Sequence, residues 1–337
     1  MQTFTEIRDN GYQGGLSLVE LMVAMLLGVV LSLGAVNLFL QSRMSFLQDE
    51  QSARMLEGGR YAQRYLSREL SMAGFYGGIL RGDDISSNLA SGSDNCYDWL
   101  ADTTHSVEHR NNVVDSAGVE SGTGDTLPSA CLSSTDTIVP GTDVLVIRRV
   151  GDRAHFLRDE TATVTGSSTF DSDTAYLRLE DYNVSTTLET GNNVGTGGSK
   201  PLAVWEYRPQ LLFVRDWSVT DGDGVPALCR KEMSSAGMGP TNCLVEGVEN
   251  LQVEFGIDTD DDYIPDRYLA SPTDAQLSFA MGARIYILMR STDELAGYTN
   301  DKAYTLGSQT VSAQNDGLYR RVYQTSILLR NSEALGI

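Results

Sequence analysis

The chain has 337 residues, of which 41% are hydrophobic, and a formal net charge of −20. This length allows one large domain or two ordinary ones with proper cores. A surface this acidic repels phosphate backbones, so we expect no direct nucleic-acid ligand unless a local basic patch exists. The sequence suggests no such patch, because the basic pairs Arg148 and Arg149, and Arg320 and Arg321, are isolated in strand-like runs.

The first predicted element is an apolar run over residues 16–40, in which Glu20 is the one charged residue. As a helix this run would be about 37 Å long at ~1.5 Å per residue, enough to cross a bilayer. The small residues Gly14 and Gly15 precede the run, whereas a secretory signal peptide has its small-residue cleavage site after the apolar region. Cleavage after Gly15 would therefore retain the hydrophobic segment and create a free amine at Leu16.

Glu20 needs a partner if it enters lipid, because an unpaired carboxylate in the hydrocarbon costs roughly 2.5–3.5 kcal/mol. The new α-amine of Leu16, about one helical turn away, would be cationic and could neutralise it. The pair could form within one chain or between neighbouring chains, and in the second case Glu20 would dock packed helices. The alternative is a carboxylate near the membrane surface with no partner.

The next segment, residues 41–73, has apolar residues at spacings of three and four, which predicts an amphipathic helix. The expected stripe includes Phe46, Leu47, Met55, Leu56, Tyr61, Tyr65, Leu66, Leu70 and Met72. Gly58 and Gly59 predict a weak point or bend, and Gly74 predicts the end of the helix. One helix over residues 16–73 would thus span the membrane with residues 16–40 and pack on a head with the rest.

The head, residues 74–337, is predicted to be β-rich. Candidate strands are residues 144–147, 175–179, 251–257, 285–289 and 319–329. Segments rich in Ser, Thr, Gly and Asp, above all residues 86–137 and 183–200, are expected to be long loops. We therefore expect an α+β fold, in which a long N-terminal helix packs on an antiparallel β-sheet head.

Four cysteines, Cys96, Cys131, Cys229 and Cys243, allow three disulfide pairings. A head on the outer side of the membrane would be in an oxidising compartment, where disulfides form. Proximity in the sequence favours Cys96–Cys131 and Cys229–Cys243, and free buried thiols are the alternative.

An acidic stretch places Asp258, Asp260, Asp262 and Asp266 at relative positions one, three, five and nine. With the Ile264 carbonyl at position seven, this spacing matches EF-hand-like calcium loops and predicts a structural Ca²⁺ site. Tyr263 stands at the sixth position, where Gly is usual, and Leu269 at the twelfth, where Glu is usual. The alternative is a solvated acidic turn between strands.

Two other motifs carry weaker predictions. The stretch from His105 to His109 matches the H-x-x-E-H zinc-peptidase pattern, but that chemistry needs a stable helix and a third ligand. With only three His in the chain and a turn-rich setting, we interpret it as a chance match in a surface loop and expect no enzymatic activity. Asp221 to Gly224, "DGDG", predicts a hairpin turn, with a second cation loop as the alternative.

The N-terminal residues Gly15 to Ala24, "GLSLVELMVA", resemble the class III signal of type IV prepilins and pseudopilins. The resemblance implies that prepilin peptidase removes the leader, residues 1–15, that Leu16 is N-methylated, and that Glu20 is the assembly carboxylate. It also implies a single-pass inner-membrane protein with its head in the periplasm, which later enters a pilus at the cell surface.

Blocks in the head resemble the PilW family of minor pilins. They are "FVRDW" at 213–217, "LCR" at 228–230, "LVEGVENLQVEFG" at 244–256, "ARIY" at 283–286 and "RRVY" at 320–323. The resemblance implies a minor pilin that primes pilus assembly, forms a tip complex and supports adhesion and twitching motility. Its implied partners are minor and major pilins, through the N-terminal helix, and a large non-pilin tip adhesin. A type II secretion pseudopilin and a pilin-anchored enzyme or adhesin head are the alternatives.

Overall fold

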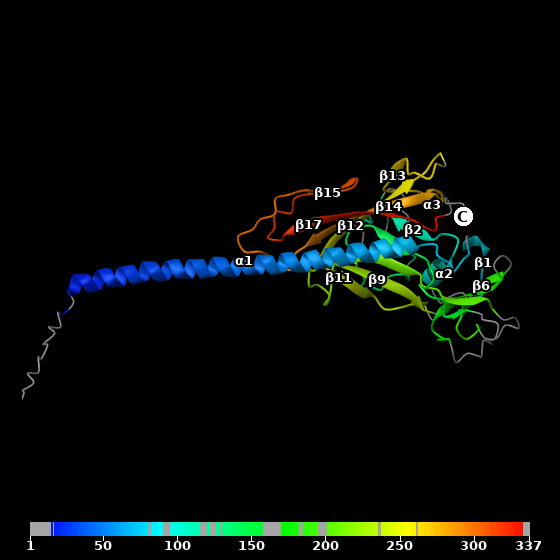
Figure 1. Ribbon diagram of the computed structural model, residues 1–337, viewed down its shortest axis with the longest axis horizontal. Helices are drawn as coiled ribbons and strands as arrows, with labels where there is room; N and C mark the ends of the chain where they lie inside the picture. Colours follow the sequence, from blue (N-terminus) through cyan, green and yellow to red (C-terminus); the bar gives the residue numbers. More distant parts are fainter. Residues whose placement is uncertain are drawn as a thin grey trace, which may run out of the picture. The chain divides into compact units, whose positions relative to one another are not determined.

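The computed structural model describes residues 15, 17–79, 82–89, 95–114, 120–121, 126–128, 130–157, 170–181, 185–194, 201–234, 237–260 and 262–332. The chain forms two compact units, residues 1–50 and residues 51–337, which we describe separately. We refer to the second unit as the head unit. Figure 1 shows the ribbon with the element labels used below.

Helix α1 (Leu18–Met72) confirms the predicted N-terminal helix. It ends two residues before Gly74, whose φ of +75° is the left-handed conformation that commonly terminates helices at glycine. The α-helix continues through Gly58 and Gly59, so the weak point or bend predicted there does not interrupt the helix. Close packing, described below, explains the glycine at position 59.

The described strands of the head unit form three β-sheets and one β-hairpin. One sheet has the order β10-β9-β8-β3-β2, with β11 also paired to β9. Its strands are β2 (Val107–Arg110), β3 (Val144–Ile147), β8 (Gln210–Arg215), β9 (Ala227–Ser234), β10 (Gly237–Met238) and β11 (Asn242–Glu246). A second sheet has the order β13-β12-β14-β17, from β12 (Val248–Ile257), β13 (Arg267–Leu269), β14 (Ala280–Arg290) and β17 (Arg320–Leu328).

The third sheet has the order β1-β6-β5-β7-β4. Its strands are β1 (Ile85–Ser87), β4 (Phe156–Leu157), β5 (Ala175–Asp181), β6 (Ser185–Thr190) and β7 (Ala203–Glu206). The hairpin consists of β15 (Tyr304–Leu306) and β16 (Gln309–Val311), and the short helices are η1 (Gly82–Asp84), α2 (Asn95–Ala101) and α3 (Asp274–Ser278). Among these described pairs β1 and β6 run parallel and the others antiparallel, so the predicted antiparallel character holds with one exception.

The largest core cluster joins α1 to the first two sheets. From α1 it contains Met55, Ala62, Leu66 and Leu70. From the sheets it contains residues such as Leu145, Leu212, Leu228, Leu251, Phe255, Ile285 and Ile287. Figure 1 shows the head part of α1 running across these strands. The predicted apolar stripe is thus confirmed at Met55, Leu66 and Leu70.

Two parts of the sequence interpretation need correction. Phe46, Leu47 and Tyr61 are exposed, so they do not belong to the buried face of α1. The segments predicted as long loops contain regular structure, namely α2 and β2 within 86–137 and β6 within 183–200. Polar composition hid these elements, because β2 and β6 are stabilised by pairing with β3 and β5 rather than by a hydrophobic pattern of their own.

Candidate functional site

The N-terminal end of α1 carries the residues predicted for processing and assembly. Ser17 caps the helix: its hydroxyl accepts a hydrogen bond from the Glu20 backbone N–H at 3.2 Å. Glu20 therefore lies in the first turn, where the helix dipole favours a carboxylate. Sequence reasoning missed Ser17, although the spacing Ser-x-x-Glu is a known signal for a helix start. Gly15 is exposed, and Leu16 lies outside the described residues.

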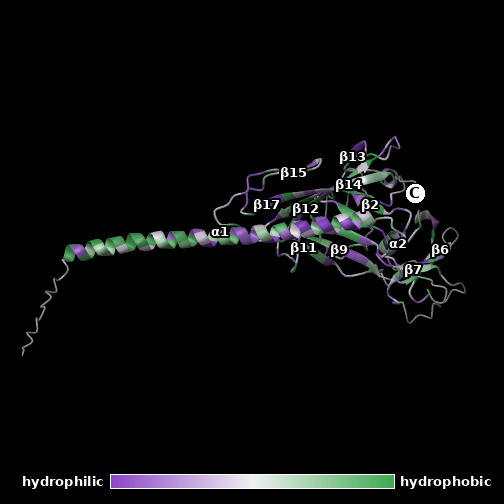
Figure 2. Cartoon of the chain, in the orientation of Figure 1, coloured by the Kyte–Doolittle hydropathy of each residue, from purple (hydrophilic) through white to green (hydrophobic). Residues whose placement is uncertain are grey.

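The first part of α1 exposes large apolar side chains on all sides. Leu18 is 76% exposed and Leu31 is 74% exposed, and the most apolar stretch of the helix has no buried residue. Figure 2 shows the hydrophobic colour along this part of the helix. In the described part of the chain, α1 is the helix whose length and composition suit a membrane span. A soluble core helix would bury this surface, so the exposure favours contact with lipid or with other helices.

Within the head unit, a buried ion pair holds the end of α1. The Arg149 guanidinium donates from Nε to Glu69 Oε2 at 2.7 Å and from Nη2 to Glu69 Oε1 at 2.9 Å. Both side chains are at most 5% exposed. Burial lowers the pKa of Arg149, but the hydrogen bonds and charge of Glu69 outweigh this and raise the pKa above its usual value. Gln210 also donates to Glu69, so the carboxylate is well satisfied.

A second contact brings α1 close to β17. The Tyr323 hydroxyl donates to the Met55 carbonyl at 3.3 Å, and the ring lies against Gly59. A Cβ atom at position 59 would lie 2.6 Å from two ring carbons, far inside normal contact. Glycine here therefore permits the close approach of helix and strand.

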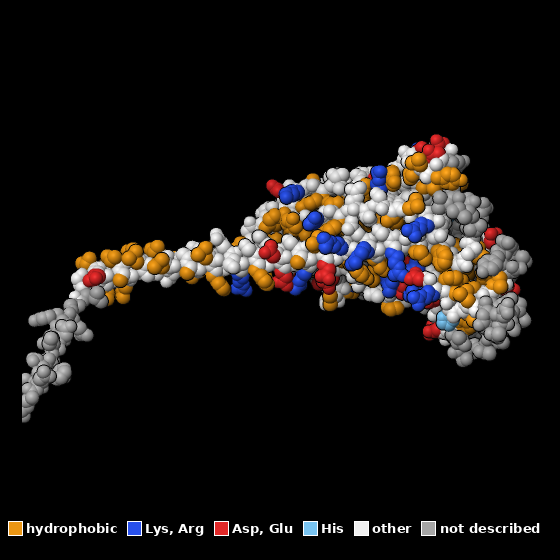
Figure 3. Space-filling view, viewed as in Figure 1, with side chains coloured by type: hydrophobic (Ala, Val, Ile, Leu, Met, Phe, Trp, Pro, Cys, Tyr) orange, Lys and Arg blue, Asp and Glu red, His pale blue; other side chains and the backbone are white. Residues whose placement is uncertain are grey.

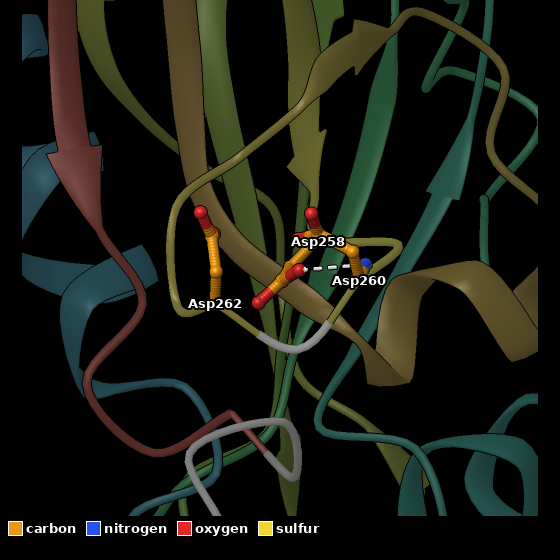
Figure 4. Close-up of side chains that lie close together, drawn as sticks. All are labelled: Asp258, Asp260 and Asp262. Atoms are coloured by element: carbon orange, nitrogen blue, oxygen red, sulfur yellow. Dashed lines mark hydrogen bonds between the residues drawn. The ribbon is translucent and has the colours of Figure 1, made fainter.

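The predicted calcium loop follows β12. Carboxylate oxygens of Asp258, Asp260 and Asp262 lie within 4.8 Å of one another, and Asp258 is buried while the other two are exposed. Figure 4 shows the three side chains on one loop. Tyr263, at the position where Gly is usual, has a φ of +64°, so the loop makes the expected sharp turn without glycine.

Other contacts of this loop limit the prediction. Asp266 lies outside the three-residue cluster and accepts hydrogen bonds from the Thr259 N–H at 2.8 Å and hydroxyl at 2.5 Å. The carboxylates of Asp262 and Asp266 raise the pKa of Asp260, because like charges disfavour ionisation. A cation would relieve this repulsion. Calcium binding by this loop, including any role of the Ile264 carbonyl, stays a prediction.

The zinc-like motif does not form a surface loop as expected. Residues 107–110 are strand β2, and Glu108 and His109 are buried. His109 Nε2 lies 2.9 Å from Asp143 Oδ2, and Glu108 accepts a hydrogen bond from Arg148 at 2.6 Å. Both groups thus have structural partners, and a strand does not present them as the zinc-peptidase helix would. The Glu and second His of the motif therefore lie in the core rather than on the surface, and the interpretation as a chance match stays a prediction.

Both disulfides expected from proximity are present. Cys96 bonds to Cys131, and Cys229 bonds to Cys243 across the paired strands β9 and β11. The segment 221–224 lies in the turn between β8 and β9, which pair antiparallel, so the predicted hairpin is confirmed. In that turn Asp223 accepts backbone hydrogen bonds from Val219 at 2.9 Å and Val225 at 2.9 Å. Its carboxylate therefore shapes the turn.

Comparison with known families is consistent with these features. Residues 10–36 match the prokaryotic N-terminal methylation motif, the class III prepilin signal. The α+β arrangement, with a long apolar N-terminal helix and a β-rich head, is a pilin-like layout that agrees with this match. Residues 216–331 match the family described as type IV pilus-assembly protein W. The two matches together support a PilW-like type IV pilin.

Searches of curated proteins and of solved structures found no match. Pilin families are structural rather than enzymatic, which fits the structural partners found for His109 and Glu108. The prepilin signal and the apolar helix fit an inner-membrane anchor that later enters the pilus. At this coarse level the expected partners are other pilins and prepilin peptidase.

Proposed function

We propose that this chain is a minor pilin that primes type IV pilus assembly and forms a tip complex with other minor pilins. In this role prepilin peptidase cleaves after Gly15, Leu16 becomes the methylated N-terminus, and residues 16–40 hold the chain in the inner membrane. The helix then packs with those of neighbouring subunits, while a non-pilin adhesin binds the tip complex and adhesion and twitching motility depend on the assembled filament.

The observation that carries the proposal is the start of α1. Glu20 lies in the first turn of a helix whose apolar side chains are exposed, and within the segment that matches the N-terminal methylation motif. A carboxylate at this place is costly in lipid unless a cation pairs with it. The α-amine of a neighbouring mature subunit can supply that cation, so Glu20 sets the register between helices. Head-to-tail contacts between subunits need not form a closed ring, and in that case they build open filaments.

The test compares the wild-type chain with Glu20→Ala and the matched, uncharged Glu20→Gln in cells with and without prepilin peptidase. We expect a mature wild-type chain that begins at N-methylated Leu16 and has both disulfides formed. Glu20→Ala and Glu20→Gln should be cleaved normally but should reduce piliation and co-purification of identified minor pilins. Unchanged piliation and co-purification would contradict the proposal. A chain that affects protein secretion but not piliation would indicate a type II secretion pseudopilin.

A further inference from the structure

The solvent-facing side of α1 in the head unit carries a row of arginines. Arg60, Arg64 and Arg68 follow one another at four-residue spacing and are all exposed. Residues at this spacing share one helix face, here the face opposite the buried Ala62 and Leu66. Figure 3 shows Lys and Arg side chains gathered along this part of the molecule. The row is a local basic surface on a chain whose net charge is −20.

A groove runs beside this row, between α1 and the edge strand β17. It has a volume of about 790 Å³ and is lined by Ala53, Leu56, Arg60, Gln63, Arg64 and Thr325, among others. Leu56 and Ala53 make part of the lining apolar, and the two arginines supply charge. β17 is the last strand of its sheet, and the Gln63 side chain of α1 donates to the Gln324 carbonyl of β17 at 2.9 Å.

The charges around the groove are available for a partner. Within the described residues, neither Arg60 nor Arg64 makes a hydrogen bond or ion pair, whereas Arg68 pairs with Asp152. Arg321 of β17 is exposed, and its guanidinium lies 5.4 Å from the centre of the Tyr323 ring. Burial raises the pKa of Tyr323, and the positive charges of Arg321 and Arg60 oppose this effect, so β17 and α1 both contribute positive charge near this hydroxyl. Glu57 is the one carboxylate among the groove-lining residues.

We propose that this groove, lined by Arg60 and Arg64, binds an acidic α-helix of another pilin subunit. The inference rests on the proposed function, which supplies neighbouring subunits. Carboxylates four residues apart on the partner helix match the spacing of Arg60 and Arg64, since four residues of any α-helix rise about 6 Å. An apolar side chain of the partner covers Leu56. Bidentate geometry makes arginine well suited to carboxylates.

A protein helix fits the groove better than nucleic acid does. Salt screens charges beyond about 8 Å for either ligand. A nucleic acid carries phosphates along its whole length and would extend over the acidic surface of a chain with net charge −20, whereas a short acidic segment need meet only the arginines of the groove. The apolar part of the groove lining also favours a protein partner, because protein–protein interfaces combine a desolvated apolar centre with a polar, charged rim.

The binding test uses the full-length protein in detergent and a fluorescent Ala-rich helical peptide with Glu at every fourth residue. The same peptide with Lys in place of Glu is the control probe. The variant is Arg60→Glu with Arg64→Glu, and the matched control is Arg153→Glu with Arg330→Glu, two exposed arginines outside the groove. We expect the groove variant to bind the Glu peptide about tenfold or more weakly, with binding by wild type decreasing as salt rises.

Three results would overturn the proposal. One is equal peptide affinity of the groove variant and the control variant. Another is an equal loss of Glu-peptide and Lys-peptide binding in the groove variant, which would show that the substitutions do not act through charge at the groove. The third is a loss of binding to phosphatidylglycerol vesicles or to a single-stranded oligonucleotide in the groove variant while Glu-peptide binding is unchanged, which would assign the basic groove to another ligand.

A cell experiment separates this proposal from the proposed function. If the wild-type chain does not co-purify with identified pilin subunits, the proposed function fails. If wild type co-purifies with them and the Arg60→Glu, Arg64→Glu variant does so equally well, the groove proposal fails alone. We expect the variant to be cleaved and inserted normally, to lose co-purification, and to differ in this from the Arg153→Glu, Arg330→Glu control.

Discussion

Replacing Gly59 by alanine tests why two glycines stand side by side in α1. In an exposed helix the change would stabilise the protein by about 1 kcal/mol, because alanine favours helices over glycine. Here the new methyl group would lie 2.6 Å from the Tyr323 ring. The ring is buried and its hydroxyl is bonded to the Met55 carbonyl, so it has little freedom to move. Overpacking of this kind costs about 1–3 kcal/mol.

The neighbouring Gly58→Ala is the matched control. Its Cβ would lie 3.2 Å from the tips of Met289 and Val245, a tight contact that small side-chain movements relieve. We therefore expect Gly58→Ala to be neutral or stabilising and Gly59→Ala to be destabilising by about 1 kcal/mol. The two variants should differ by about 1–2 kcal/mol, or roughly 2–8 °C in Tm for a large domain.

Thermal unfolding of the full-length protein in detergent, followed by tryptophan fluorescence, measures this difference. The tryptophans, Trp99, Trp205 and Trp217, all lie in the head unit and report on it. In a Tyr323→Leu background the obstructing ring is gone, so Gly59→Ala should become neutral or stabilising. Equal Tm values for the two single variants, or a cost of Gly59→Ala that persists without the ring, would refute the packing explanation.

Three further predictions concern charged groups. Glu69→Gln leaves the Arg149 cation buried without its main partner and should lower the unfolding free energy by about 3–5 kcal/mol. Arg68→Ala breaks a largely exposed ion pair and should lower the unfolding free energy by less than about 1 kcal/mol. Equal Tm shifts for the two variants would contradict this prediction. Burial raises the pKa of Asp136, but hydrogen bonds from Ser133 and the charge of Lys231 outweigh it and set the pKa below its usual value. The stability that this carboxylate contributes is present above about pH 4 and is lost as the pH falls through the lowered pKa. The unfolding free energy of Asp136→Asn should therefore depend less on pH below about pH 4 than that of the wild type. Identical pH dependence of the two proteins would argue against the role of this carboxylate. If the loop after β12 binds Ca²⁺, calcium at about 100 times its Kd should stabilise the wild type by about 2.7 kcal/mol relative to the protein in chelator. Asp260→Asn should reduce this stabilisation. If calorimetry detects no calcium-dependent shift in Tm, the solvated turn is favoured.

Features that depend on neighbours in the sequence were predictable. The 3.6-residue period and the glycine at 74 determine where α1 lies and ends. A continuous apolar run predicts β3 and alternation predicts β12, and proximity was sufficient to pair the four cysteines. At the candidate site, the order of Gly15, Leu16 and Glu20 along the chain is enough by itself to predict processing and assembly.

Features that depend on distant partners were not predictable. The polar strand β2 is stable because it pairs with β3, and its buried Glu108 is neutralised by Arg148, forty residues later in the sequence. Glu69 meets Arg149 in the same way, over a separation of eighty residues. A sequence shows that such charges exist, but their burial and pairing arise only when the chain folds.

The sequence by itself thus predicted the long apolar N-terminal helix, the methylation motif and the main strands, because helix period, strand pattern and short motifs are local properties. Tertiary structure decided which side of α1 is buried, why Gly59 must lack a side chain, and that single arginines along the helix form one row beside β17. Isolated charges at four-residue spacing look scattered in a sequence. They become a surface only when a helix aligns them and an edge strand provides the other side of the groove.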